Sequence, residues 1–203
     1  MISPELANTQ VRLDKGRAMV EVLDIRKEND IRILENGATA KLLKKGLYDF
    51  EVASNEVRVF HGSAEVTAGN RHVKLGDNQQ VVIGDTALKA VHFEGRQYED
   101  AFYRWSALRS GYLSEASVNI AGTFIGRGPG WYGPGWHGLG WYWDPWFGVY
   151  TFVHADGIFW SPFGWGFYSP IFIYRSPYRF YGGYPHAFAE YHYPYGHGFP
   201  AHR

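Results

Sequence analysis

Residues 57–66 read VRVFHGSAEV: a short alternating run, a glycine, and a second alternating run. The same order occurs at 11–20, VRLDKGRAMV, with the arginine, the glycine and an alanine in the same places. A looser copy at 31–40, IRILENGATA, has one extra residue before its glycine. Alternation with a period of two predicts strands with one buried and one solvated face, and each glycine predicts a turn. We therefore interpret each copy as a hairpin unit.

Further runs of this kind, separated by turn residues, continue to about residue 93. Sheets with one solvated face are antiparallel by preference. Copies at irregular spacing favour a stacked β-roll or sandwich over a strict solenoid. We predict a mainly β domain, an antiparallel β-roll or sandwich, over residues 1–93.

The next segment, 97–121, is predicted to be one amphipathic helix. Glu99 and Asp100 would lie in its first turn, where carboxylates complement the helix dipole. Gly111 costs about 1 kcal/mol relative to alanine inside a helix. Apolar residues at steps of three and four form the expected buried stripe: Tyr98, Phe102, Trp105, Leu108, Tyr112, Leu113 and Ala116.

Composition changes sharply after residue 125. The 20 Lys and Arg residues balance the 20 Asp and Glu residues over the whole chain, but only four of the former and three of the latter follow this point. A neutral chain offers no basic face for nucleic acid. There is no cysteine, which excludes disulfides and thiolate metal sites.

Residues 126–170 form an aromatic segment rich in Gly, Trp and Pro, whose glycines and prolines predict irregular structure. One short hairpin is predicted, with strands 149–153 and 158–160 around the turn dipeptide Asp156-Gly157. Residues 171–203 are predicted to be a disordered, low-complexity tail.

Candidate catalytic and cofactor sites fail on their local chemistry. The run GPGWYG at 128–133 matches a dinucleotide-binding pattern, but Pro129 has no N–H and no helix is predicted to follow. Asp144 and Asp156 could form a glycosidase pair, yet each precedes a turn residue, which favours a turn-forming role. We assign no catalytic residue and no cofactor, and expect a protein that is not an enzyme.

Two weaker groups of candidate site residues lie in the aromatic half. The tail histidines could wrap a divalent metal, but a solvated polar-aromatic tail with incidental metal affinity is the favoured interpretation: His186, His192, His197 and His202. The tryptophans could form a buried core or an exposed platform for glycan, peptide or lipid: Trp131, Trp136, Trp141, Trp143, Trp146, Trp160 and Trp165.

No segment predicts a membrane span, because prolines and glycines interrupt the most apolar run, 158–174. The first ten residues, MISPELANTQ, lack the basic and apolar regions of a signal peptide.

Three stretches resemble a known family. Residues 55–85, NEVRVFHGSAEVTAGNRHVKLGDNQQVVIGD, resemble the second half of a FecR domain, an all-β periplasmic module. Together with YRWSALRSGYLSEA at 103–116 and the runs GWYWDPWFGVYTF and GIFWSPFGWGFYSP at 140–152 and 157–170, the chain is similar to acidobacterial FecR-domain proteins. The resemblance implies an N-terminally shortened chain whose full-length form lies in the periplasm or cell envelope.

This resemblance predicts a non-enzymatic, extracytoplasmic interaction module whose partner is a protein or a cell-envelope component. The alternative is a ligand-sensing or signalling domain related to FecR sigma-factor regulators, which predicts a membrane span and a sigma-factor-binding segment encoded upstream. Glycan or metal binding by the aromatic, histidine-rich tail is a third possibility. The sequence does not indicate an oligomeric state.

Overall fold

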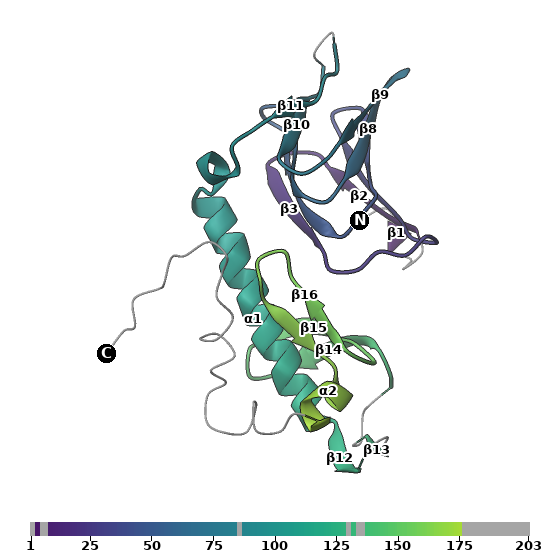
Figure 1. The fold of residues 1–203 in the computed structure, drawn as a ribbon, viewed down its shortest axis with the longest axis vertical. Coiled ribbons are helices and arrows are strands. Elements are labelled where there is room, and N and C mark those ends of the chain that lie inside the picture. Colours follow the sequence, from purple (N-terminus) through teal and green to yellow (C-terminus); the bar gives the residue numbers. More distant parts are fainter. Residues whose placement is uncertain (1–2, 5–7, 85–86, 129–130, 133–136, 176–203) are drawn as a thin grey trace, which may run out of the picture. The chain divides into compact units, whose positions relative to one another are not determined.

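The computed structural model places most of the chain. It describes residues 3–4, 8–84, 87–128, 131–132 and 137–175. The chain divides into two compact units, Met1–Arg109 with Ser161–Phe163, and Ser110–Trp160 with Gly164–Arg203. Each unit is described by itself below, with the elements labelled as in Figure 1.

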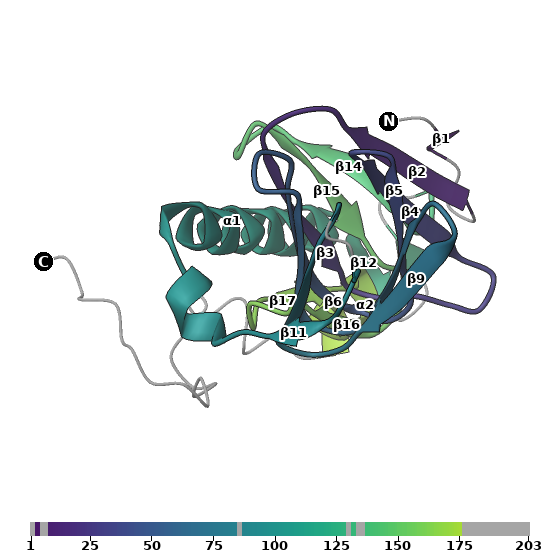
Figure 2. The same cartoon turned by 90° about the horizontal axis from the view of Figure 1, so that it is seen from above.

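The first unit contains two β-sheets. One sheet has the strand order β1 (Ser3–Pro4), β2 (Asn8–Leu13), β4 (Asp30–Glu35), β5 (Ala38–Leu42), β8 (Ala64–Ala68), β9 (Arg71–Leu75). The other has the order β11 (Val91–His92), β10 (Gln79–Val82), β7 (Glu56–His61), β6 (Gly46–Glu51), β3 (Arg17–Val22). Figure 2 shows the two layers. The predicted mainly β sandwich is confirmed.

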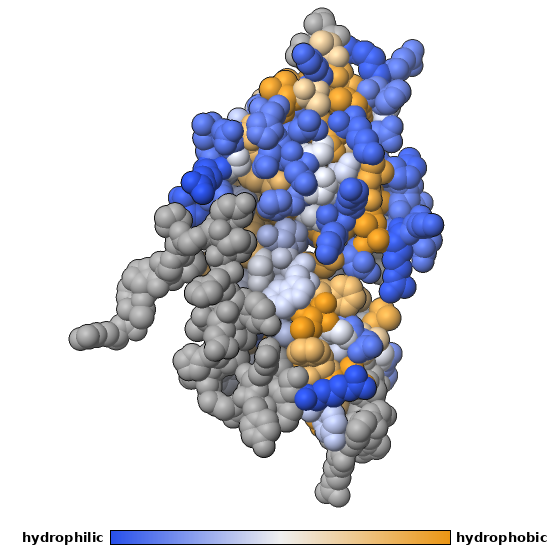
Figure 3. Space-filling view, in the orientation of Figure 1, coloured by the Kyte–Doolittle hydropathy of each residue, from blue (hydrophilic) through white to orange (hydrophobic). Residues whose placement is uncertain are grey.

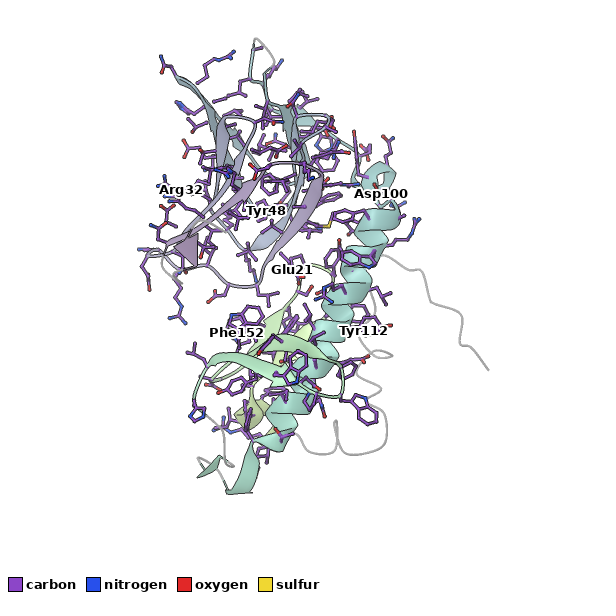
Figure 4. The ribbon with its side chains drawn as sticks, turned by 180° about the vertical axis from the view of Figure 1, so that it is seen from behind. Glu21, Arg32, Tyr48, Asp100, Tyr112 and Phe152 are labelled. Carbon is purple, nitrogen blue, oxygen red and sulfur yellow. The ribbon has the colours of Figure 1, made fainter. Side chains whose placement is uncertain are left out.

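The core of this unit lies between the sheets, because alternate residues of each strand turn their apolar side chains inward. Both sheets contribute fully buried side chains to it, among them Leu42, Val66 and Leu75 from one sheet and Tyr48, Phe50, Val57, Val59 and Val81 from the other. In Figure 4, Tyr48 lies between the layers and Arg32 lies on the outside. Burial of this apolar surface is the main term that holds the unit together.

One strand pair departs from the antiparallel pattern. Strands β2 and β4 are parallel, with Val11 opposite Ile33. Parallel neighbours need a crossover between them. Here β3 provides the crossover, since it pairs with β6 in the other sheet.

The three sequence repeats do not fold alike, and the hairpin interpretation is correct for only one of them. In the copy at 31–40, β4 and β5 pair directly around Asn36 and Gly37, whose φ angles of 45° and 76° suit a two-residue hairpin turn. In the copies at 11–20 and 57–66, the second strand joins the opposite sheet. The extra residue of the looser copy is therefore Asn36, one half of the tight turn.

Gly62 shows why the copy at 57–66 forms an arch between the sheets. Its φ is +105°, and a Cβ there would lie 2.5 Å from the Tyr48 hydroxyl oxygen and 2.8 Å from the Lys45 carbonyl oxygen. The buried Tyr48 hydroxyl donates to the carbonyl of Lys44 and accepts from the N–H of Ser63 at 3.2 Å. The tyrosine thus joins two consecutive arches, which need the backbone approach that glycine permits.

The helical segment begins later than predicted. A 3₁₀ helix, η1 (Gly95–Tyr98), precedes the helix α1 (Ala101–Thr123), and the boundary between the two compact units falls within α1 after Arg109. Asp100 accepts a hydrogen bond from the Tyr103 N–H at 2.9 Å and so satisfies one of the free donors at the start of α1. The carboxylates expected in the first turn of the helix instead precede it.

The second unit contains short paired strands packed with α1. Its elements after α1 are β12 (Ile125–Gly128), β13 (Trp131–Tyr132), β14 (Gly140–Asp144), β15 (Val149–Val153), β16 (Ile158–Trp160), β17 (Gly166–Tyr168) and α2 (Pro170–Arg175). Its core includes Ile120, Ala121, Phe124, Val153, Tyr168 and Ile173. Of the helices in the described ranges, none combines the length and the apolar character that a membrane crossing needs.

The predicted hairpin has the correct strands but the wrong partners. β15 pairs with β14, and β16 pairs with β17, so strands 149–153 and 158–160 belong to two different hairpins. Gly157 does adopt a positive φ of 79°, as the Asp-Gly dipeptide predicts. That turn links the two hairpins, because β15 pairs with the strand before it and β16 pairs with the strand after it.

The ordered chain extends beyond the predicted start of the tail at residue 171. α2 covers Pro170–Arg175, and Ile173 is fully buried in the second core. The N–H groups of Phe172 and Ile173 donate to the carbonyl oxygen of Ser169. Residues 176–203, the rest of the predicted tail, lie outside the described part of the chain.

Candidate interaction surface

The face of α1 that the second unit buries consists mostly of small residues, together with Ile120, and Ala116 is the one member of the predicted apolar stripe that belongs to it. The buried positions are Ser110, Gly111, Ser114, Ala116, Ser117, Ile120 and Ala121. Trp105, Leu108 and Tyr112 are instead at least half exposed. Small side chains let strands approach the helix closely, and their hydroxyls can bond to strand carbonyls.

Gly111 is a position of close approach. A Cβ at this position would lie 3.1 Å from the Cε2 atom of Trp165, tighter than ordinary van der Waals contact. Gly111, which has a low helix propensity, is therefore the position against which the indole ring of Trp165 packs.

Side-chain hydrogen bonds fasten the hairpins to α1. Ser114 Oγ donates to the Gly166 carbonyl at 2.6 Å, and Ser117 Oγ donates to the Phe152 carbonyl at 3.3 Å. In the opposite direction, Thr151 Oγ1 donates to the Leu113 carbonyl at 2.8 Å. The bonds of Ser117 and Thr151 fix the inner face of the β14–β15 hairpin to the helix, and the bond of Ser114 fixes β17 of the second hairpin.

The turn of this hairpin is built on Asp144. Its side chain is fully buried, and one carboxylate oxygen accepts from the N–H groups of Trp146 and Phe147 at 2.8 and 3.1 Å. The other oxygen accepts from Asn119 Nδ2 on α1 at 2.8 Å. All of these partners are donors of the turn and the helix, which is the turn-forming role that the sequence favours.

The outer face of the hairpin carries a ladder of aromatic rings. Strand alternation turns Asp144, Thr151 and Val153 inward and the neighbouring residues outward. Across the strands, Trp141 meets Phe152 with centroids 5.5 Å apart, and Trp143 meets Tyr150 at 5.1 Å. These tilted and edge-on contacts are the favoured geometries for aromatic pairs.

The rings of this ladder remain largely exposed despite their mutual contacts. Trp141, Trp143 and Tyr150 are 65%, 50% and 61% exposed, and Trp146 in the turn is 84% exposed. We call Trp141, Trp143, Trp146, Tyr150 and Phe152 the aromatic face. Figure 4 places Phe152 on β15. Exposed apolar patches are characteristic of interaction sites, so the aromatic face is the candidate interaction surface of this unit.

Two crystal structures of a candidate anti-sigma factor from Parabacteroides distasonis ATCC 8503 are similar to parts of the chain at 16% sequence identity. One alignment covers 45% of each chain with a TM-score of 0.36, and the other covers 42% of each with 0.34. The chain thus matches less than half the length of these structures. A similarity at this level assigns neither a fold nor a function. The chain matches no model of a protein family, and a comparison with curated proteins finds no match.

The candidate tryptophans divide into exposed ones, a partly buried one, and those whose side chains the structure does not describe. Trp141, Trp143 and Trp146 belong to the aromatic face, and Trp160 is 39% exposed on β16. Trp165 is partly buried against α1. The structure does not describe the side chain of Trp131, and Trp136 lies outside the described residues. The choice between core and platform therefore has a different answer at different positions.

The polar candidates are separated in the structure. Asp144 is buried in its turn, whereas Asp156 is exposed and accepts from the N–H of Gly157 at 2.8 Å. Within the described ranges, no group of three His, Asp or Glu side chains is arranged to hold a metal ion. The four candidate tail histidines, His186, His192, His197 and His202, lie outside those ranges.

Sequence reasoning missed a buried charge cluster in the first unit. Asp49 is fully buried and accepts from Arg17 at 2.8 and 3.0 Å and from Arg58 at 2.9 Å. Burial lowers the pKa of Arg58, but its bonds to Asp49 and Glu51 outweigh this and raise the pKa above its usual value. Tyr98 covers the cluster, with its ring 4.5 Å from the Arg58 guanidinium. Because every charge here is paired, the cluster has a structural role.

Glu35 is a separate buried carboxyl group in the same unit. Its side chain is 3% exposed, and neither carboxylate oxygen has a hydrogen-bond partner. Burial, together with the charges of Asp49 and Glu51, raises its pKa to about 7. The sequence contained one signal of this burial. Glu35 lies two residues after the buried Ile33, so strand alternation places both side chains on the same inward face.

Proposed function

We propose that the chain is a non-enzymatic, extracytoplasmic interaction module of the FecR-like type, and that the aromatic face contacts a component of the cell envelope. The observation that carries the proposal is the exposure of Trp141, Trp143 and Trp146 on a hairpin that is bonded to α1. Exposed apolar rings lose contact with water when a partner covers them, which favours binding.

The distribution of polar groups supports a binding role over a chemical one. Asp144, the only acidic residue in the hairpin, is buried and engaged in its turn. The charge cluster around Asp49 is equally engaged within the β-sandwich. Apart from Pro145, the side chains that the hairpin exposes to solvent are aromatic rings. Figure 3 shows one face, on which hydrophilic side chains are in the majority over the first unit and pale and orange side chains lie beside a few hydrophilic ones over the second.

The test is binding of the purified full chain to a sedimented envelope fraction from the organism that encodes it. We expect the triple substitution of Trp141, Trp143 and Trp146 by serine to reduce binding by about tenfold or more. Trp105→Ser is the matched control, because this tryptophan is 56% exposed but lies on α1. Equal binding by the triple variant and the native chain would refute the role of the aromatic face.

The compartment is tested separately with the native gene in its own organism. We expect the product in the periplasmic or envelope fraction, as the resemblance to FecR-domain proteins implies. A wholly cytosolic product would overturn the extracytoplasmic part of the proposal.

A further inference from the structure

We propose that the aromatic face is a docking site for a phospholipid bilayer surface of zero net charge, with Trp146 as the residue that enters the headgroup region. The inference rests on the proposed function and names the partner class of the same surface.

The first argument is the chemistry of the exposed side chains. Trp141, Trp143, Trp146 and Tyr150 each combine an apolar ring with one polar group at its edge, and all four are at least half exposed. Such rings gather at the boundary between hydrocarbon and water, where both parts are satisfied. Leu139, which precedes β14 and is 56% exposed, adds an aliphatic side chain.

The second argument is charge. Residues 137–160 contain no Lys or Arg, and of their two carboxylates Asp144 is buried while Asp156 follows the hairpin. The face therefore has no cation to attract anionic lipid or acidic polymer. Within the hairpin residues 140–153, the exposed side chains are those of Trp141, Trp143, Pro145, Trp146 and Tyr150, and none of them is a carboxylate, an amide or a cation of the kind that rims a protein interface or orients a glycan. An electroneutral headgroup layer requires none of these cations or polar groups on the protein.

The third argument is preorganisation. The Trp146 N–H is held by Asp144, and Asp144 is held by Asn119 on α1. The turn is therefore fixed while the indole ring is 84% exposed. A ring presented on a fixed backbone loses little conformational freedom on binding, which strengthens association.

The test is co-sedimentation of the full chain with vesicles of pure phosphatidylcholine. We expect binding that changes by less than about twofold when phosphatidylglycerol is added or when salt is raised to about 0.5 M, because no cation takes part. Trp143→Ser with Trp146→Ser should lower the partition coefficient by about tenfold or more, from the loss of buried ring surface. Trp105→Ser should stay within about twofold of the native chain.

A second measurement needs no double substitution. Phosphatidylcholine brominated on its acyl chains should quench the tryptophan fluorescence of the native chain, and Trp146→Phe should reduce that quenching. Absence of quenching in the native chain would overturn the inference even if the double variant failed to fold.

The remaining outcomes separate this inference from the proposed function. If vesicles are not bound but the tryptophans are still needed for binding to lipid-extracted cell wall or to an envelope protein, the lipid inference is overturned and the proposed function stands. If binding requires phosphatidylglycerol and disappears in salt, the lipid inference is again overturned. If neither vesicles nor the envelope fraction depend on the tryptophans, both are overturned.

Discussion

A methyl group on Gly111 would lie 3.1 Å from Cε2 of the Trp165 ring. The two residues are far apart in sequence, yet the ring closes over the one position of that helical turn that has no side chain. Serine hydroxyls on the same buried face bond to strand carbonyls. The packing of the second unit thus depends on small residues of α1, and the first prediction tests this.

Gly111→Ala should destabilise the protein by about 1 kcal/mol, because overpacking against Trp165 exceeds the gain in helix propensity. Gly122→Ala is the matched control on the same helix, since nothing lies within 4 Å of a Cβ there. It should stabilise the protein by up to about 1 kcal/mol. Urea denaturation followed by circular dichroism measures both, and equal stabilisation by the two substitutions would contradict the packing.

Asp144→Ala should cost about 1–3 kcal/mol, because two turn N–H groups and Asn119 lose their acceptor. It should also weaken binding by the aromatic face, since the turn that carries Trp146 would lose its support. Asp156→Ala removes an exposed carboxylate and should change stability by less than about 0.5 kcal/mol. Thermal denaturation of the two variants checks the difference, and similar melting temperatures would refute the bracing role of Asp144.

Glu35 should make the stability of the first unit fall as the pH rises from about 4.5 to about 7. Its pKa is about 7 in the folded protein against an ordinary value of 4.5, so the folded state holds the proton more tightly. The resulting stabilisation is complete below pH 4.5 and is lost as the pH passes through 7, an effect of about 1–3 kcal/mol.

Glu35→Gln should remove this pH dependence and give a protein more stable than the native chain at pH 8. Glu94→Gln, which replaces an exposed carboxylate, should leave the profile unchanged. Urea denaturation at a series of pH values gives the free energy of unfolding for each. The prediction is contradicted if the free energy of unfolding of the native chain rises steadily between pH 4.5 and 7. It is also contradicted if Glu35→Gln does not flatten the pH dependence, because Glu35 is then not neutral in the folded protein.

Arg58→Met should destabilise the first unit by about 3 kcal/mol, because Asp49 stays buried with only Arg17 as a charged partner. The control is Arg26→Met, since Arg26 and Asp24 form an exposed pair at 3.6 Å. Such a pair contributes less than about 1 kcal/mol. Chemical denaturation should separate the two variants clearly, and an equal loss in both would argue against a buried network.

Strand positions in the first unit follow from alternation, and the two-sheet sandwich was predictable for that reason. Which sheet each strand joins was not predictable from the repeats. Three similar segments give one hairpin and two arches, since Asn36 completes a two-residue turn in one copy while Gly62 lies against Tyr48 and Lys45 in another. The period of apolar alternation and the composition are local properties of a segment. The sheet that a strand joins depends instead on which other part of the chain its turn packs against.

The candidate site shows the same division. The sequence by itself determined that residues 126–170 are aromatic and almost uncharged, and that Asp144 and Asp156 favour turns, because these properties reside in single residues and dipeptides. Only the tertiary structure decided that β15 pairs with β14, that α1 buries its small residues, and that Trp141, Trp143 and Trp146 face solvent while Trp165 packs on Gly111. Burial of a tryptophan side chain stabilises the fold at any position. Composition therefore does not show which of the tryptophans are buried. Hydrogen bonds and close contacts with α1 fix which face of each strand turns inward.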